Sequence, residues 1–458
     1  MTPQELRTSI LQYAIQGRLT EQNTDDLSLN NIFSSIHPSD DVPYDIPVSW
    51  KWFRLEDIAT LYNGRAYKKP EMLTKGKYPL LRVGNLFTND NWYYSDLELE
   101  PEKYCEEGDL LYAWSASFGP HIWKGEKVIY HYHIWKVELK NPDMRDYLYW
   151  ALEAQTQALK KSGHGSTMIH ITKANTEKML IPLPPLEEQK RIVAKLEEIL
   201  PLIDCYAAAW NKLEEFNKRF PGDMQKSILQ LAIQGKLVEQ CPEEGTGEEL
   251  FQQILAEKQA LIKAGKIKKE KQLPEITEDE IPFEIPDTWK WTRVAAITTL
   301  NPKNDLEDDL DTAFIPMPCV MDGFKNQHTF EIKKWKEIKK GFTHFADGDI
   351  GVAKITPCFQ NRKSVIFHNL QNGYGAGTTE LTIVRTIEET VLREYLLWFF
   401  KTDYFIKNGV KSFTGTAGQQ RIHKDYLATC LIPLPPLAEQ KRIVSRIEEI
   451  LPLCEKLK

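Results

Sequence analysis

Two stretches of the sequence combine basic, amide, hydroxyl and aromatic residues in loops between short β-like runs. Arginine, asparagine and glutamine pair with the edges of nucleic-acid bases, whereas lysine, serine and threonine suit phosphates. The candidate contacts in the first stretch are Lys68, Lys69, Arg82, Asn85, Trp114, Ser115, Ser117, His121, His131, His133, His164, Ser166 and Thr167. Those in the second are Lys354, Thr356, Gln360, Asn361, Arg362, Lys363, Thr378, Thr379, Thr416, Gln419, Gln420 and Arg421.

Some of these candidates stand close together. Residues 360–363 read Gln-Asn-Arg-Lys, and residues 163–167 read Gly-His-Gly-Ser-Thr. Glycine-rich runs such as the latter, and residues 414–418, let the backbone come close to a phosphate because glycine has no side chain. Any solvated surface carries polar residues, so the clusters predict binding more firmly than the isolated candidates do.

No comparable set of catalytic residues is found. The sequence has no GxxxxGK[ST] loop, no GxGxxG after a strand and no GxSxG. His131 and His133 would share one face of a strand, but no third metal ligand is evident. Asp349 with Lys354 resembles part of a nuclease site, yet one such pair is expected by chance in a chain with 27% charged residues. We therefore predict no catalytic residue, metal or cofactor in this chain.

The sequence is an internal duplication. Residues 10–22 return at 228–240 with ten of thirteen positions identical, and residues 180–193 return at 431–444 with thirteen of fourteen identical. Residues 46–61 return at 285–300, so about 21 residues are inserted in the second copy around 241–284. Between the matched blocks the copies diverge, with echoes such as Gly108-Asp109 against Gly348-Asp349. Such a chain is a repeated frame that holds two different modules.

The frame is predicted to be helical. Pro184-Pro185 precedes a helix start, and apolar residues then alternate four and three apart, as in a coiled coil, at Ile192, Leu196, Ile199, Ile203, Tyr206, Trp210 and Leu213. Pro201 and Pro452 are expected to kink or split this helix. Residues 221–222 (Pro-Gly) are read as a turn before a second helix, 224–237. If the chain ends meet, residues 10–22 would continue the last repeat and close a pseudo-twofold ring.

Composition excludes several protein classes. With 458 residues, 42% hydrophobic, the chain is globular and long enough for about three domains. No apolar run approaches a membrane span and no secretory signal is evident. Seven scattered cysteines without a CxxC pair fit a reducing cytoplasm, and the formal charge of −7 excludes a uniformly basic DNA-coating protein.

The frame resembles a known family. LIPLPPLEEQKRIV with its second copy, the ILQxAIQGxL repeats and the P-x-x-W-K-W segments before each module are similar to the DNA specificity subunit of type I restriction-modification systems, over essentially the whole chain. The resemblance implies that each module is a target-recognition domain for one half of a split DNA sequence. It also implies that two long helical regions pack antiparallel and set the gap.

The same resemblance implies partners. Methyltransferase subunits would carry S-adenosylmethionine, and restriction subunits would use ATP and magnesium, whereas this chain would be non-catalytic. Residues 349–358 with 377–380, and residues 108–115, resemble two different target-domain subtypes. We therefore expect an asymmetric bipartite target on double-stranded DNA.

The predicted fold class is α+β: two mixed α/β target-recognition domains, separated by two long antiparallel coiled-coil regions, with a pseudo-twofold internal duplication. The predicted boundaries are 1–25 for a helical segment that completes the distal conserved region, 26–180 and 246–430 for the two domains, 181–245 for the central spacer and 431–458 for the distal helix. Three alternatives stay open: an enzyme with an unrecognised motif, a partner-free DNA-binding protein, and a specificity subunit whose partner carries methylase and nuclease on one chain.

Overall fold

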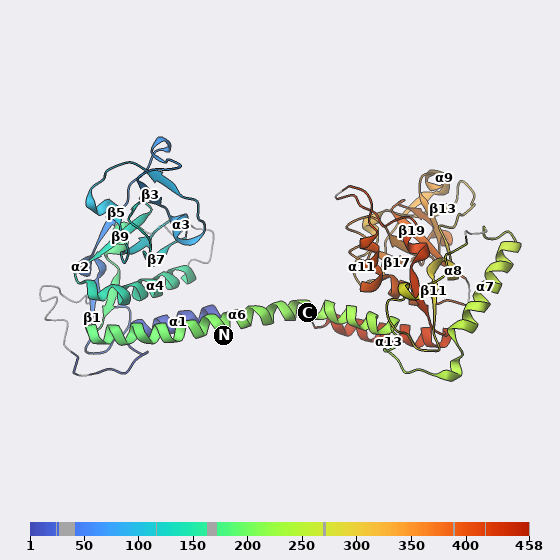
Figure 1. Ribbon diagram of the computed structural model, residues 1–458, viewed down its shortest axis with the longest axis horizontal. Helices are drawn as coiled ribbons and strands as arrows, with labels where there is room; N and C mark the ends of the chain where they lie inside the picture. The colour runs from blue at the N-terminus through green and yellow to red at the C-terminus, as the bar shows by residue number, and fades with distance from the viewer. Residues whose placement is uncertain are drawn as a thin grey trace. The chain divides into compact units, whose positions relative to one another are not determined.

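The computed structural model describes residues 1–23, 25–26, 42–115, 117–162, 172–268, 272–387, 390–416 and 418–457, with the side chains of residues 161 and 162 left out. The chain divides into two compact units, Met1–Glu214 (unit 1) and Glu215–Lys458 (unit 2), and the division falls inside one helix, α6 (Leu186–Ile233) (Figure 1). Each unit holds one copy of the sequence repeat. The finer boundaries drawn from the sequence stay predictions.

Unit 1 contains two four-stranded sheets and a small antiparallel pair. The first sheet has the order β2 (Ala59–Asn63), β9 (Ile134–Leu139), β6 (Leu110–Ala113), β7 (Gly119–Ile122); the second has the order β4 (Tyr93–Ser95), β3 (Tyr78–Leu81), β8 (Val128–Tyr130), β5 (Tyr104–Cys105). The small pair is β1 (Lys51–Arg54) with β10 (Leu180–Leu183). The helices between these strands are α2 (Leu55–Ile58), α3 (Val83–Phe87), α4 (Arg145–Ser162) and α5 (Lys173–Glu177).

Unit 2 repeats this topology although its module shares little sequence with the first. Its sheets have the orders β12 (Thr298–Leu300), β19 (Leu381–Thr386), β16 (Ile350–Ala353), β17 (Ser364–Ile366) and β14 (Glu331–Lys334), β13 (Asp311–Ile315), β18 (Tyr374–Gly377), β15 (Thr343–Ala346). β11 (Lys290–Arg293) pairs with β20 (Leu431–Leu434). In both units one pair of strands is parallel, β3 with β8 and β13 with β18. The mixed α+β class predicted from the sequence is confirmed.

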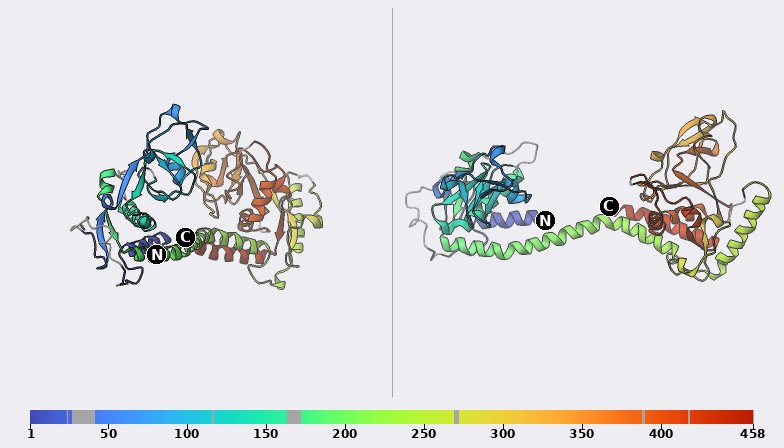
Figure 2. Two further views of the ribbon diagram at one scale, coloured as in Figure 1. Left: turned by 60° about the vertical axis from the view of Figure 1, so that its left-hand side comes forward. Right: turned by 45° about the horizontal axis from the view of Figure 1, so that its top comes forward.

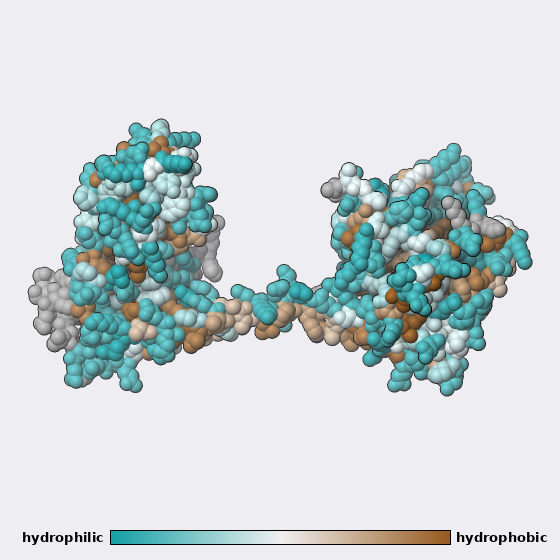
Figure 3. Space-filling model, in the orientation of Figure 1, coloured by the Kyte–Doolittle hydropathy of each residue, from teal (hydrophilic) through white to brown (hydrophobic). Residues whose placement is uncertain are grey.

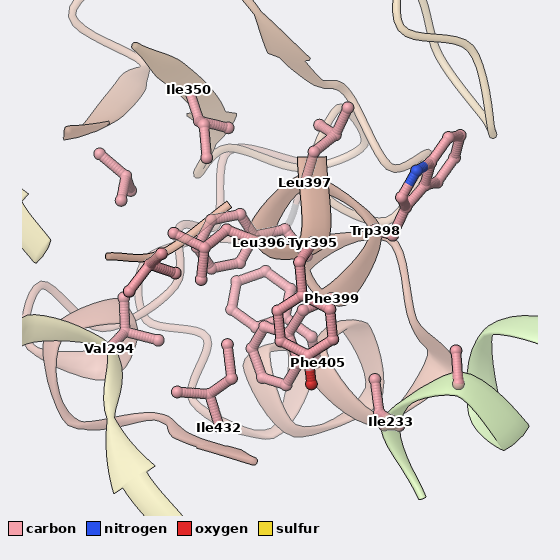
Figure 4. Packing of buried hydrophobic residues seen from close by; sticks show 14 of the residues in the cluster. Ile233, Val294, Ile350, Tyr395, Leu396, Leu397, Trp398, Phe399, Phe405 and Ile432 are labelled. Atoms are coloured by element: carbon pink, nitrogen blue, oxygen red, sulfur yellow. The ribbon is translucent and has the colours of Figure 1, made fainter. Parts of the chain in front are cut away.

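The helices of unit 2 are α7 (Gly247–Lys263), α8 (Val294–Ile297), α9 (Trp335–Ile338), α10 (Arg393–Phe400), α11 (Asp403–Lys411), α12 (Tyr426–Thr429) and α13 (Leu437–Glu455). α10 brings a run of aromatic and apolar residues into the core, where they lie among Ile350 of β16, Ile432 of β20 and Ile233 of α6 (Figure 4). The inserted segment of the second copy contains α7, whose Leu250 and Ile254 are buried in the same core.

The Gly-Asp pair that recurs in both modules, as Gly108-Asp109 and Gly348-Asp349, forms the same turn in both units. Gly108 and Gly348 have φ of 91° and 88°, a conformation that favours glycine. The following aspartate accepts a backbone hydrogen bond of 2.8 Å in each case, Asp109 from Glu106 and Asp349 from Ala346. The turn therefore leads into β6 and β16 in the same way.

The frame packs within each unit. α1 (Pro3–Ile15), capped by Thr2, runs antiparallel to the first part of α6, since Arg7 pairs with Asp204 at 3.1 Å while Gln22 donates to Glu188 at 3.0 Å (Figure 2). α13 packs in the same core as the last part of α6, and its Arg442 donates to the backbone oxygen of Glu239, just after α6, at 2.9 Å. Leu11, Ala14 and Ile15 thus belong to the core of unit 1, as Leu229, Ala232 and Ile233 belong to that of unit 2.

The expected split of the central helix at Pro201 and the expected turn at residues 221–222 are wrong, whereas a kink at Pro201 stays a prediction. α6 starts at Leu186, as the two prolines before it predict, but then runs through Pro201 and Pro221-Gly222 without a turn. A proline inside a helix removes one hydrogen bond and costs about 3 kcal/mol. Leu200 and Ile203, on either side of Pro201, are buried in the unit 1 core, and Pro221 is itself buried. Packing of these turns offsets the lost bond, and α13 likewise continues through Pro452.

The predicted apolar seam is only half buried. Ile192, Leu196 and Ile203 are in the unit 1 core, but Leu213 is 54% exposed and Tyr206 37%. Figure 3 shows apolar residues at the surface along this stretch of α6. The apolar side chains in the second half of the seam are thus partly exposed to solvent, whereas those in the first half are buried in the unit 1 core.

Two further observations concern the cysteines and the composition of the helices. All seven cysteines are free thiols. Among the described residues, no helix has both the length and the apolar composition that a membrane span requires.

Candidate nucleic-acid interface

The strand register makes the loops of the two units comparable residue by residue. Ala113 at the end of β6 lies opposite Ile134 of β9, and Ala353 at the end of β16 lies opposite Leu381 of β19. Trp114 therefore corresponds to Lys354, and residues 131–133 correspond to residues 378–380. The correspondence extends to a hydrogen bond: the amide of Trp114 donates to His133 O at 3.1 Å, and that of Lys354 donates to Glu380 O at 3.0 Å.

We call residues 114–115, 117–118 and 131–133 the unit 1 loop cluster. Its rings are in contact, with centroid distances of 4.8 Å for Trp114–His133, 4.8 Å for His131–His133 and 3.9 Å for Tyr132–His133. The indole of Trp114 also stacks on Trp135 of β9 at 5.8 Å and donates to Tyr132 O at 2.9 Å. Ser115 and Ser117 are partly exposed beside it. The structure thus brings together Trp114, Ser115, Ser117, His131 and His133 from the predicted set.

The imidazoles of this cluster are neutral at neutral pH. Burial, His133 and Arg82 lower the pKa of His131 to about 4, and burial lowers the pKa of His133. A charged imidazole would lose hydration here without gaining a carboxylate partner. The surface that the cluster offers is therefore aromatic and uncharged.

The nearby arginines are engaged with other groups. Arg65 forms two hydrogen bonds with Glu71, at 2.8 and 3.1 Å. Arg82 lies over the ring of Tyr93 at 4.4 Å and donates to Asn91 O at 2.9 Å. Asn85 accepts from the amide of Arg82 at 3.1 Å and so caps α3. Arg82 and Asn85 therefore order α3, and Arg82 also affects His131 electrostatically.

Other candidates of unit 1 lie apart from the cluster. Lys68 and Lys69 are exposed at the short turn that the Glu71 carboxylate caps, and no contact ties their side chains to the cluster rings. His121 on β7 lines a cavity of about 290 Å³ together with Tyr149, Trp150 and Glu197, and burial lowers its pKa. His164, Ser166 and Thr167 lie outside the described residues.

We call residues 354–363, 378–380, 414–416 and 418–421 the unit 2 loop cluster. Backbone hydrogen bonds join its first range to its last: the amide of Thr356 donates to Gln420 O at 2.8 Å, and that of Ile422, next to the cluster, donates to Lys354 O at 3.0 Å. The guanidinium of Arg421 binds both carboxylate oxygens of Glu380, at 2.7 and 2.9 Å. Thr356 donates to the side-chain oxygen of Gln360 at 2.5 Å. Exposed members are Gln360, Asn361, Thr379, Thr416, Gln419 and Arg421, and half-buried members are Lys354, Thr356, Thr378 and Gln420.

The unit 2 loop cluster is built around an ion pair, whereas the unit 1 loop cluster is built around contacts between aromatic rings. Arg421 and Lys354 lower the pKa of Glu380 although burial raises it, so the carboxylate is ionised at neutral pH. The place taken by Trp114 and His133 in unit 1 is taken here by Lys354 and Glu380. One frame therefore presents two surfaces of different chemistry.

Two candidates of unit 2 have mainly internal contacts. Arg362 pairs with Asp403 and donates to Lys401 O at 3.0 Å, while Lys363 donates to Met317 O at 3.2 Å. Both side chains therefore hold the β16–β17 loop against α11 and β13. Of residues 360–363, Gln360 and Asn361 face solvent.

Lys401, fully buried below this loop, gives a test of how the loop is anchored. Its amine donates to Gly323 O at 2.8 Å and to Arg362 O at 3.0 Å, and burial, with Arg362, lowers its pKa to about 7. The unfolded state binds this proton more tightly, so the free energy of unfolding rises with pH between about 7 and about 10. When the pH falls from about 9 to about 7, we expect the free energy of unfolding of unit 2 to fall by roughly 2–3 kcal/mol.

Urea denaturation at both pH values measures this loss. Lys401→Met is less stable overall, because two carbonyl oxygens lose their donor, but its pH dependence is expected to be flatter by the same amount. An equal slope in wild type and variant would contradict the anchoring role.

The lysines of β14 and α9 do not form an unneutralised basic patch. Lys334 pairs with Asp311 at 2.8 Å, Lys336 with Asp309 at 2.8 Å and Lys339 with Asp308 at 2.5 Å. Within the described ranges, no group of three or more His, Cys, Asp or Glu side chains is placed to hold a metal ion.

One exposed residue of the unit 1 loop cluster, Tyr132, belongs to the sequence run Tyr130-His-Tyr-His133, of which the predicted contacts include the two histidines alone. Tyr132 lies between these histidines and is 39% exposed, more than either of them. A strand or loop that turns His131 and His133 to one side turns the residue between them to the other, so the run itself indicates Tyr132.

Comparisons with known proteins agree with this architecture. The chain matches the type I restriction modification DNA specificity domain twice, over residues 47–215 and 288–457. It is 50% identical over 235 residues to the type I restriction enzyme EcoAI specificity subunit of Escherichia coli and 47% identical over 235 residues to the EcoEI specificity subunit of the same organism. Each alignment covers 51% of this chain and 40% of the relative, so the match spans about two fifths of these relatives.

A solved structure is similar as well. The HsdS subunit from Thermoanaerobacter tengcongensis aligns with a TM-score of 0.43 and 19% identity, over 91% of this chain and 92% of that one.

Proposed function

We propose a function from the premise that this chain belongs to the family of type I restriction modification DNA specificity domains: it is the non-catalytic subunit that selects the DNA sequence on which partner subunits act. Each unit would read one half of a bipartite target on double-stranded DNA. The target would be asymmetric, because the two units differ in the residues that they present.

The observation that carries this proposal is the matched pair of loop clusters. Strands of the same order and register end just before Trp114 and Lys354, and the amides of these two residues make the same backbone hydrogen bond. The side chains at these ends differ in chemistry, aromatic in unit 1 and ionic in unit 2. A fixed frame with changed end residues is what recognition of two different base sequences requires, since bases are distinguished by the groups that contact their edges.

The proposal extends to partners. Methyltransferase subunits would dock on the helical frame, where α6 exposes Leu213, Phe216 and Phe220. Those subunits would bind S-adenosylmethionine, and restriction subunits would use ATP and magnesium. Because most of a DNA complex's affinity comes from phosphate contacts, and this chain has a formal charge of −7, the partners would also provide much of the cationic surface.

Selection from a random DNA library tests this function. The chain alone, and the chain assembled with methyltransferase subunits of a type I system from the same organism, are each used to enrich bound duplexes. We expect the assembled complex to enrich two short sequences at a fixed separation, and the chain alone to enrich little. Enrichment of a single uninterrupted sequence by the complex would contradict two-unit recognition, and strong enrichment by the chain alone would favour a partner-free DNA-binding protein.

A further inference from the structure

Tyr132 is held at the exposed end of the β8–β9 loop by contacts on both sides of its backbone. Its amide donates to Arg65 O at 3.0 Å, and its carbonyl oxygen accepts from the indole of Trp114 at 2.9 Å. Its ring lies 3.9 Å from that of His133 and 5.9 Å from that of Trp114. An aromatic side chain that is fixed before binding loses little conformational entropy when it contacts a ligand.

Of the two histidines and two arginines around Tyr132, only Arg82 carries a charge that no carboxylate neutralises. The flanking histidines are neutral at neutral pH, because burial lowers the pKa of each. Arg65 is neutralised by Glu71, and the guanidinium of Arg82 lies over Tyr93 and donates to Asn91 O. A phosphate would find few free donors here, whereas the apolar surface of a base would find a ring.

The corresponding position in unit 2 is Thr379, which is also exposed. There the neighbours are Lys354, Glu380 and Arg421, two cations and one carboxylate. The same loop end is thus suited to polar and ionic contact in unit 2 and to apolar contact in unit 1. The contrast points to a division of the recognition chemistry between the units.

We propose that Tyr132 is a specificity-determining residue, which contacts the apolar surface of a base in the unit 1 half of the target, and that phosphates play no part in this contact. This proposal rests on the proposed function. In a duplex a ring reaches the edge of a base, such as the methyl group of thymine, and the loss of recognition at one base pair costs roughly 1–3 kcal/mol, which corresponds to a 5- to 150-fold change in affinity.

The test uses the complex with methyltransferase subunits and a duplex with its preferred sequence, and measures Kd at several salt concentrations. Tyr132→Ala is expected to weaken binding about tenfold or more at every salt concentration, so that the slope of log Kd against log salt stays as in wild type. It is also expected to relax the sequence preference in the unit 1 half alone. Tyr132→Phe keeps the ring and should stay within about threefold of wild type.

Tyr374→Ala serves as the matched control, because Tyr374 is 38% exposed on unit 2 and outside both loop clusters. Unchanged thermal unfolding of each variant verifies the fold.

Three results would overturn the proposal: binding by Tyr132→Ala within twofold of wild type, an equal loss on unrelated DNA, or a loss accompanied by a shallower salt slope, which would indicate a phosphate contact. These results differ from failure of the proposed function itself, in which the wild-type complex would show no sequence preference at all.

Discussion

Replacing Lys354 and Gln360 together by alanine is expected to lower methylation of the target by roughly a hundredfold or more in the assembled complex. Gln360 is exposed and Lys354 half-buried within the unit 2 loop cluster. Each such contact to a base edge or phosphate is worth about 1–3 kcal/mol, and each 1.4 kcal/mol is a factor of ten. The frame should survive, since Arg421 and Glu380 keep their ion pair.

The sequence preference of this double variant is as informative as its rate. The methylated sites should vary in base sequence in one half of the target and keep the wild-type base sequence in the other half. Lys336→Ala is the matched control, because it removes a positive charge from α9 of the same unit outside the loop cluster. If the double variant relaxed both halves equally while remaining folded and assembled, modular recognition would be wrong.

Asp349→Ala is expected to cost unit 2 about 3 kcal/mol of unfolding free energy. The carboxylate is 2% exposed, binds Arg385 through both oxygens at 2.7 Å and accepts the amide of Ala346. Its removal leaves a partly buried amide donor and a guanidinium without their acceptor. Calorimetry of the full chain would measure the fall in the unfolding midpoint relative to wild type.

The matched variant is Asp109→Ala in unit 1. Asp109 occupies the same turn and pairs with Lys136 at 2.7 Å, but its side chain is 24% exposed, so water can replace part of what is lost. We expect a cost of about 1 kcal/mol. Equal costs for the two substitutions would show that burial does not set the difference.

Elements with a local sequence signal are predictable, in the frame and in the modules alike. The two prolines Pro184-Pro185 predict the helix start of α6, the β-like runs at 109–114 and 381–385 match β6 and β19, and the helical pattern of residues 144–158 matches α4. The sequence of residues 391–406 predicts one helical stretch, but the structure has two helices there, α10 and α11, because Thr402 caps α11 after Lys401 turns into the core. The duplication was evident from identical blocks alone.

The equivalence of the two modules was not predictable in the same way. Trp114 and Lys354 share no residue type, and only strand pairing shows that they occupy one position. Arg362 and Lys363 appeared to be free contacts in the sequence, but their partners Asp403 and Met317 lie about 40 residues away or more. The continuity of α6 depends likewise on packing around Pro201 and Pro221. A rule that considers only the residues next to a proline does not take this packing into account.

The most direct test of recognition by two units is adenine-methylation mapping of a host genome. The chain and a methyltransferase subunit of a type I system from the same organism are expressed together and then each alone. We predict a split motif with a fixed gap that appears only when both are present. A motif that appears with this chain alone, or an uninterrupted motif with both, would contradict the assignment of a non-catalytic chain that reads two half-sites.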